Sequence, residues 1–399
     1  MPRDICQHLD FDEQHRAQCV APGFVAFGEL TASVCESCEF HQPTTVPLDP
    51  QLVREFHALR LTPQTPIPVV EDSLQAPPTR RPDGYWEWEN VQQAFRNLTD
   101  QAIADFVPHD DVGTGRGIVV VGGGRYLVSA YVTIRVLRHV GCDLPIELWH
   151  LDDEVDAHME QLLLDQGAVC RNAEEHHRQT QSTFRFMPNW QKGWQLKAYA
   201  LTHCGFDEIL LLDADSYPTR DPAFLFDCPT YVQTGSVFCP DTFIPNAEVN
   251  ERVGRAFGFV VDDEVWAESG QMMIHKSRCQ RELALALHYN SLADFTYRIV
   301  YGDKDTFPLA WRRLGTPFGR LWPRCGSARK SIVQLDEQGH PLFQHRIHDK
   351  FRLTAIQFDS TRQLSPGNSF IPELQHEIFC NRVLHQLRKI WKPEDKLLG

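Results

Sequence analysis

The stretch Glu208-Ile-Leu-Leu-Leu-Asp-Ala-Asp215 does most to decide how the rest of this sequence is interpreted. Its apolar run predicts a strand that is buried on both faces of a sheet. The strand carries the carboxylates of Asp213 and Asp215 to its carboxyl end, where open α/β sheets bind ligands. Because the residue between them is a small alanine, both carboxylates can approach one divalent cation, and oxygen ligands favour Mg²⁺ or Mn²⁺.

Strands and helices alternate on the amino-terminal side of this stretch. The apolar runs at 118–121 and 146–151 predict two further buried strands. Helices are expected after each of them, up to about Val140 and up to Gln166, and a third is expected over 190–203. This alternation predicts an α/β domain with a mostly parallel sheet and helices on both faces.

Three glycines, at positions 122–124, follow the first of these strands. A dinucleotide-binding fingerprint would need another glycine at position 127, which is Leu127, so the NAD fingerprint is excluded. A strand, a glycine turn and a helix in this order can still bind a nucleotide.

The amino-terminal segment has a different character. Four cysteines fall within the first 38 residues: Cys6, Cys19, Cys35 and Cys38. The last two form a C-x-x-C knuckle, so we expect structural Zn²⁺, with an iron–sulfur cluster, disulfides or free thiols as alternatives. Such a module could also dock a protein partner. The other eight cysteines are scattered, as is typical of buried free thiols.

Proline content divides the chain further. Residues 43–86 are proline-rich and predict a linker or an extended wrap. Helical spacing of apolar residues then predicts an amphipathic helix over 88–107. We therefore expect a cysteine-rich module at 1–42, the proline-rich segment at 43–86, and one catalytic domain at 87–399.

The charge of the chain limits its partners. Of 399 residues, 39 are Lys or Arg and 53 are Asp or Glu, which gives a net charge of −14. A chain this acidic is poorly suited to bind nucleic acid or an anionic membrane. It has no run of 18 apolar residues and begins without an apolar leader, so we expect no membrane span and a cytoplasmic location.

Two enzyme classes place two aspartates, one residue apart, after a buried strand. Phosphatases of the haloacid dehalogenase type use the first aspartate as a nucleophile, but Tyr217 stands where they have Thr or Val. Nucleotide-sugar glycosyltransferases of the GT-A type use both aspartates to hold a metal against a diphosphate, which fits better. A binding protein without catalysis is a third possibility.

A series of short blocks makes the second class more specific. In order, they are Gly117–Val119 with Gly122-Gly123, Leu137-Arg138, Gly141–Glu147, Leu196–Ala198, Leu211–Asp215 with Asp221-Pro222, Glu268–Gln271, Gly302–Phe307, and Phe343–Arg346 with Lys350. Over about 235 positions this series resembles a mannosyltransferase family that includes the fungal Golgi α-1,3-mannosyltransferases. The resemblance implies a GT-A fold, a nucleotide-sugar donor, a divalent metal and retention of anomeric configuration.

The resemblance also implies roles for individual residues. The expected metal ligands are Asp213, Asp215 and His345. The expected donor-binding residues are Gly122, Gly123, Lys197, Asp213, Asp215, Arg346 and Lys350. The expected catalytic residues are Glu268, Gln271 and Asp303, while Asp305 could simply cap the next helix. The implied reaction moves a hexose such as mannose onto a glycan or another hydroxyl acceptor.

Overall fold

The computed structural model describes residues 9–11, 17–19, 88–187, 192–242, 244–263, 266–321, 325–328, 331–347, 350–353, 371 and 373–392. The chain forms two compact units, residues 1–97 and 98–399. In the first unit, β1 (Leu9–Phe11) pairs antiparallel with β2 (Ala17–Cys19). Helix α3 spans Trp88–Ala104, close to the 88–107 expected from periodicity.

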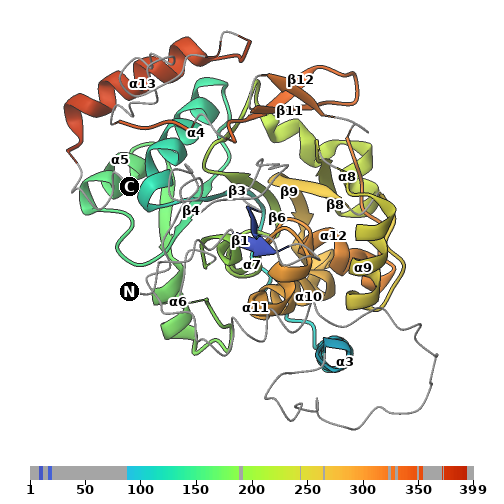
Figure 1. Cartoon of the computed structure of the whole chain (residues 1–399). Helices are drawn as coiled ribbons and strands as arrows, with labels where there is room; N and C mark the ends of the chain where they lie inside the picture. The colour runs from blue at the N-terminus through green and yellow to red at the C-terminus, as the bar shows by residue number, and fades with distance from the viewer. Residues whose placement is uncertain are drawn as a thin grey trace. The chain divides into compact units, whose positions relative to one another are not determined.

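A six-stranded sheet organises the second unit (Figure 1). Its order is β5 (Ala168–Asn172), β4 (Ile146–His150), β3 (Arg116–Val121), β6 (Glu208–Asp213), β9 (Ala267–His275) and β8 (Ser236–Pro240). The first four strands are parallel, and β9 runs antiparallel to both β6 and β8. The predicted α/β class with a mostly parallel sheet is therefore confirmed.

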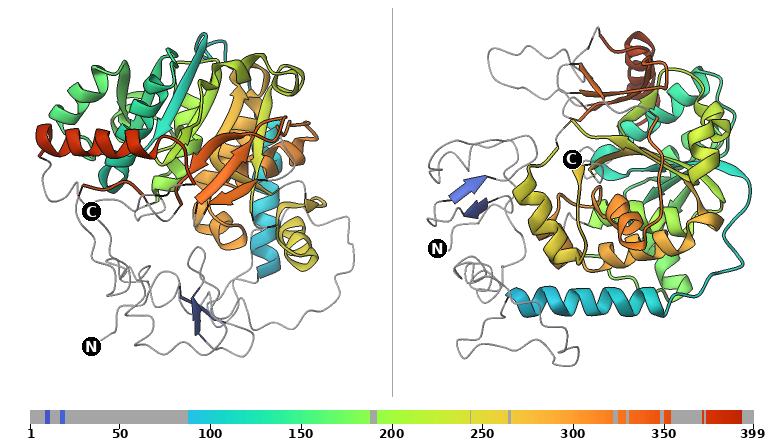
Figure 2. Two further views of the ribbon diagram at one scale, coloured as in Figure 1. Left: turned by 90° about the horizontal axis from the view of Figure 1, so that it is seen from above. Right: turned by 90° about the vertical axis from the view of Figure 1, so that its right-hand side faces the viewer.

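Helices cover both faces of this sheet (Figure 2). Side chains at even positions of β3 and β6, such as Ile118 and Leu212, pack in one core with α4 (Leu127–His139), α5 (Ala157–Leu164) and α13 (Glu377–Ile390). The opposite face carries α7 (Lys192–His203), which packs against α10 (Gln280–Ser291), and α10 in turn contacts α12 (Thr306–Leu314). Because side chains alternate along a strand, Asp213 faces the α7 side.

The remaining helices fill the connections. They are α6 (Ala173–Thr180), α8 (Pro229–Thr234), α9 (Ala247–Phe257) and α11 (Ala293–Ile299), with 3₁₀ turns at Gly124–Tyr126, Pro222–Asp227 and Lys276–Arg278. Glycines with positive φ follow several helices, including Gly167, the predicted stop. In the described part of the chain no helix is long and apolar enough to cross a bilayer.

A second, smaller sheet joins the large one at the two aspartates. Its order is β10 (Gly326–Ala328), β11 (Ser331–Leu335), β12 (Pro341–His345) and β7 (Ser216–Pro218), all antiparallel. Strand β7 starts directly after Asp215 and pairs Ser216 with His345. The chain thus leaves one sheet and enters the other across three residues, 213–215.

The structure tests several expectations that came from the sequence. Residues Glu268–Gln271, which the family resemblance singled out, lie inside β9. Six of the eight scattered cysteines are buried, and Cys170 and Cys325 are partly exposed. Cys6, Cys35 and Cys38 and the side chain of Cys19 lie outside the described residues, so the zinc or iron–sulfur site stays a prediction.

Gly122 shows how tightly β3 approaches the aspartate turn. A Cβ atom at Gly122 would lie 2.7 Å from the Cβ of Ala214. The backbone N–H of Ala214 donates to the carbonyl oxygen of Val121 at 3.2 Å, and its carbonyl accepts from the Thr133 hydroxyl at 2.7 Å. A residue without a side chain is therefore required beside Ala214.

We expect Gly122→Ala to destabilise the chain by about 1 to 3 kcal/mol, because it overpacks a fixed backbone contact. The matched control is Gly193→Ala in α7, where nothing lies within 4 Å of the added methyl group. That control should be neutral or stabilising, by up to about 1 kcal/mol, because alanine favours the helix. Urea unfolding of both variants measures the difference, and equal midpoints would contradict the packing argument.

Candidate active site

The junction of the two sheets gathers four acidic side chains, here called the carboxylate cluster: Asp213, which is partly exposed, and the buried Asp215, Glu268 and Asp303. Asp213 and Asp215 come from the end of β6, Glu268 from β9, and Asp303 from the turn before α12. Three basic side chains contact them: Lys197, His345 and Lys350. The structure thus brings together seven residues that the sequence had proposed for the site.

Lys197 connects two members of the cluster. Its Nζ lies 2.9 Å from Asp213 Oδ1 and 3.2 Å from Asp303 Oδ2, and it donates to Ser269 Oγ at 2.8 Å. Burial lowers the pKa of this lysine, but Asp213 and Asp303 outweigh burial and raise the pKa above its ordinary value. Lys197 is therefore a buried cation that is held between the carboxylates of Asp213 and Asp303.

His345 connects the other members. Its Nε2 lies 3.3 Å from Asp215 Oδ1 and 3.8 Å from Asp213 Oδ2, and its Nδ1 lies 2.9 Å from Glu268 Oε1. Burial lowers the pKa of this imidazole, but Glu268 and Asp215 raise it to about 10. Gly270 makes room for the ring, since a Cβ there would lie 2.5 Å from Nδ1.

The two aspartates after β6 have different environments. Burial raises the pKa of Asp213 to about 6, with Lys197 and His345 opposing the rise. Burial also raises the pKa of Asp215, but Lys350 and His345 outweigh burial and lower this pKa below its usual range. Asp213 is also the more exposed, at 18% of its side chain against 4% for Asp215. Asp213 is thus the more accessible of the two aspartates.

An irregular register in β9 places the side chain of Glu268. Phe238 of β8 pairs with Met272, but the next residue, Cys239, pairs with Glu268, so β9 bulges between them. Bulges of this kind re-aim side chains near functional sites. Glu268 Oε1 accepts from the Gly270 N–H at 2.7 Å, and Oε2 accepts from Gln271 Nε2 at 2.6 Å.

Gln271, three residues after Glu268 in β9, holds the Glu268 carboxylate in place. Its Oε1 accepts a hydrogen bond of 2.9 Å from the hydroxyl of Ser216, and its side chain is almost fully buried. Both polar ends of Gln271 are therefore used inside the protein. These contacts describe a residue that positions Glu268.

The donor set of the cluster fits a divalent cation. One ligand atom each from Asp213, Glu268 and His345 lies within 4.8 Å of the others. The contact of His345 Nδ1 with Glu268 lacks hydrogen-bond geometry, so this buried nitrogen has no hydrogen-bond partner among the described residues. Carboxylate oxygens with one imidazole suit Mn²⁺ or Mg²⁺. Glu268 is thus a candidate ligand that the sequence had suggested for catalysis.

Arg346 does not join the cluster. Its guanidinium is fully buried and lies 2.5 Å from Glu377 Oε1, which also accepts from the Tyr217 hydroxyl. The backbone of Arg346 touches the site, because its N–H donates to the carbonyl oxygen of Asp215 at 3.0 Å. We correct the donor-binding interpretation of this side chain: it forms a structural ion pair with α13.

The two predicted glycines have different neighbours. Gly122 lies against Ala214, while a Cβ at Gly123 would lie 2.5 Å from Glu154 Oε2. Asp305 does occupy the N-cap position of α12, but its carboxylate makes no cap hydrogen bond and instead accepts from the N–H of Tyr301 and from Lys304.

The sequence predicted Lys350 but not its basic and aromatic neighbours Arg125, Tyr126 and Arg352. Arg125 lies 4.9 Å from the ring of Tyr126, and Lys350 Nζ lies 5.3 Å from the same ring. Burial and the charge of Arg125 lower the pKa of Arg352. Among the described residues no carboxylate pairs with Arg352. Arg125, Tyr126 and Arg352 become candidates only through their position beside the glycine turn, and that position is visible only in the structure.

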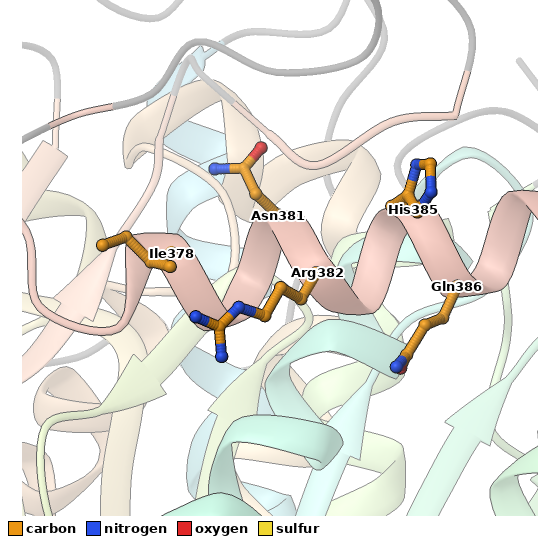
Figure 3. Close-up of a pocket in the computed structure, with 5 residues that line it drawn as sticks. All are labelled: Ile378, Asn381, Arg382, His385 and Gln386. Atoms are coloured by element: carbon orange, nitrogen blue, oxygen red, sulfur yellow. The ribbon is translucent and has the colours of Figure 1, made fainter.

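A shallow pocket lies elsewhere, on α13 (Figure 3). Its lining residues recur at helical spacing along that helix: Ile378, Asn381, Arg382, His385 and Gln386. None of them belongs to the carboxylate cluster, and we assign this pocket no role.

Comparison with known proteins adds an independent observation. A family model described as "Mannosyltransferase putative" matches residues 115–264 and 259–320, together just over half of the chain. The α-1,2-mannosyltransferase MNN2 of Saccharomyces cerevisiae is 28% identical over 269 residues, which cover 56% of this chain and 44% of that protein. The α-1,2-mannosyltransferase MNN24 of Candida albicans is 28% identical over 306 residues, which cover 65% and 42%.

These relatives are longer than the chain, which spans less than half the length of either one. Both are named for α-1,2 linkages, so the expected likeness to α-1,3-mannosyltransferases is not supported. Among solved structures, the glycosyltransferase GlyE of Streptococcus pneumoniae superposes with a TM-score of 0.40 at 12% identity, over 71% of this chain and 66% of that chain.

We expect Glu377→Gln to destabilise the chain by about 3 to 5 kcal/mol, because it leaves the buried guanidinium of Arg346 without its counter-charge. Glu160→Gln, an exposed change in α5, is the matched control and should stay within about 0.5 kcal/mol of the wild type. Chemical denaturation measures both variants. A wild-type stability for Glu377→Gln would show that this ion pair is not structural.

Proposed function

Because the chain belongs to the mannosyltransferase family whose model spans residues 115–320, we propose that it is a metal-dependent glycosyltransferase with a GT-A-type domain. It transfers a hexose, most simply mannose, from a nucleotide-sugar donor to a hydroxyl group of a glycan or a similar acceptor. The observation that carries the proposal is the carboxylate cluster at the carboxyl edge of the parallel strands, with His345 beside it.

Charge balance supports a metal at this place. Four carboxylates face two ammonium groups, Lys197 and Lys350, so a protonated His345 still leaves one negative charge in excess. Buried charges that lack partners are costly, commonly by several kcal/mol per ion. A divalent cation with a neutral imidazole would balance the same group of side chains.

Asp213, Asp215 and His345 would hold this cation, with Glu268 as a further ligand from β9. Bound there, the metal would stabilise negative charge on the diphosphate that leaves the sugar. The basic residues beside the glycine turn, Arg125, Lys350 and Arg352, supply positive charge for the same anion. Arg352 in particular lacks a carboxylate partner in the described part of the chain, which suits an anionic ligand.

The other side of Asp213 suits the sugar. Asp303 Oδ2 lies 3.2 Å from Lys197 Nζ and 3.3 Å from Ser269 Oγ, so this carboxylate is held rigidly by two donors. A fixed carboxylate of this kind orients sugar hydroxyl groups by accepting their hydrogen bonds. Glu268, held in place by Gln271, lies on the same side of the site.

Retention of configuration is part of the proposal. The relatives are named for α linkages, and the sugar of GDP-mannose is also α-linked. Transfer from an α donor to an α product keeps the configuration, through either a carboxylate nucleophile or departure on the same face as attack. Glu268 and Asp303 are the carboxylates available for the first route.

No observation favours the two alternatives that the sequence left open. A phosphatase would use Asp213 as a nucleophile, and an aspartyl-phosphate analogue trapped with beryllium fluoride would support it. A binding protein without catalysis would bind a nucleotide sugar without turning it over. The family match favours transfer.

We expect Asp213→Asn to lower Mn²⁺-dependent transfer by about 100-fold or more, because it removes the exposed carboxylate of the proposed metal–diphosphate site. Asp110→Asn, an exposed carboxylate in a loop, is the control and should keep wild-type activity. A panel of GDP-, UDP- and dTDP-sugars with radiolabelled sugar identifies the donor, and thermal unfolding confirms that both variants fold. Full Mn²⁺-dependent transfer by folded Asp213→Asn would refute the proposal.

A further inference from the structure

Three aromatic rings gather close to Asp303. The ring centroid of Trp194 lies 6.1 Å from that of Tyr301 and 5.9 Å from that of Tyr297. Tyr301 is 43% exposed, which is unusual for a large aromatic side chain so near a buried ion network. Trp194 and Tyr301, here called the aromatic pair, have no role in the site described above.

The fold places this pair where a ligand binds. Helix α7 connects parallel strands, so it runs opposite to them and its first turn lies at their carboxyl edge. Trp194 stands in that first turn, three residues before Lys197, and therefore on the same side of the helix. The aromatic pair thus lies at the edge of the sheet that carries the carboxylate cluster.

Gly302 joins the aromatic pair directly to the cluster. It lies between Tyr301 and Asp303 with φ +72°, and a Cβ there would meet Trp194 Cε3 at 2.7 Å. The indole ring therefore packs on the backbone of the turn that presents Asp303. Asp303 and Tyr301 are therefore carried by one turn, and Trp194 packs on that turn.

The turn that carries Tyr301 is held in place. The N–H of Tyr301 donates to Asp305 Oδ2 at 2.9 Å. Lys304 Nζ binds Asp241 Oδ2 at 2.8 Å and Asp305 Oδ1 at 2.9 Å, and it lies 5.7 Å from the Tyr301 ring centroid. A ring fixed in this way loses little conformational entropy when it binds a ligand.

The order of contacts through the site indicates which ligand this is. Starting from the anion-binding end, the contacts run from Lys350 to Asp215, His345, Asp213, Lys197 and Asp303. The aromatic pair follows Asp303 in this order, at the opposite end of the series from Lys350. The proposed donor has its diphosphate near Lys350 and its sugar near Asp213 and Asp303. The aromatic pair would then contact the acceptor, which is the molecule that receives the sugar.

We propose that Trp194 and Tyr301 form a stacking platform for the acceptor, which is a hexose ring or a glycan that ends in one. This inference rests on the proposed function. The C–H face of a hexose is apolar and covers an aromatic ring, while its hydroxyl groups need polar partners at the rim. Asp241 and Lys304 supply polar groups beside the Tyr301 ring.

The test compares Tyr301→Ala and Tyr301→Phe with the wild-type full-length chain, using methyl α-D-mannopyranoside as the acceptor probe. Tyr301→Ala should raise the acceptor KM by about tenfold, since a factor of ten corresponds to the loss of one good stacking contact. Tyr301→Phe keeps the ring and should recover most of the affinity. Saturation-transfer NMR gives a second readout: the sugar-ring signals should appear with wild type and weaken with Tyr301→Ala.

The matched control is Phe224→Ala, which removes an equally exposed aromatic side chain, at 42%, from a 3₁₀ turn elsewhere. It should change neither readout. An unchanged acceptor KM in Tyr301→Ala, or a parallel loss of donor affinity in calorimetry, would overturn the inference. Failure of the wild type to bind any nucleotide sugar would instead refute the proposed function, so the two failures are distinguishable.

Discussion

Placing four carboxylates side by side, three of them buried, is the constraint on which the rest of this structure depends. Each one would be costly on its own, and neighbouring negative charges increase that cost. Lys197, His345 and Lys350 are drawn into the protein to offset it, from α7, β12 and the segment after β12. The bulge in β9 and the missing side chain at Gly270 give these groups room to meet.

The same constraint explains why two sheets meet where they do. Residues 213–215 end β6 and lead directly into β7, which brings His345 alongside through its pairing with Ser216. The buried ion pair of Arg346 with Glu377 fastens this second sheet to α13. A chain that separated the sheets would leave the imidazole and the carboxylates without one another. The contacts that join the two sheets are therefore the same contacts that assemble the site.

The sequence predicted those parts of the structure that depend on neighbouring residues. The strand at 208–213 and the aspartates after it follow from local hydrophobicity, and His345 followed from the family resemblance. It did not predict the small sheet, because β7 and β12 are more than 120 residues apart and both are short. Arg346 was misplaced for a related reason, since its partner Glu377 lies on a distant helix. Contacts between remote segments leave no periodic signal.

The central claim is that the carboxylate cluster holds a divalent cation, and electron paramagnetic resonance of Mn²⁺ tests it most directly. Titration of the full-length chain should show one tightly bound Mn²⁺, and His345→Gln should lose most of that binding while keeping the fold. The matched control, His340→Gln, changes an exposed histidine at the other end of the same hairpin and should keep it. Equal Mn²⁺ binding by wild type and folded His345→Gln would contradict the account.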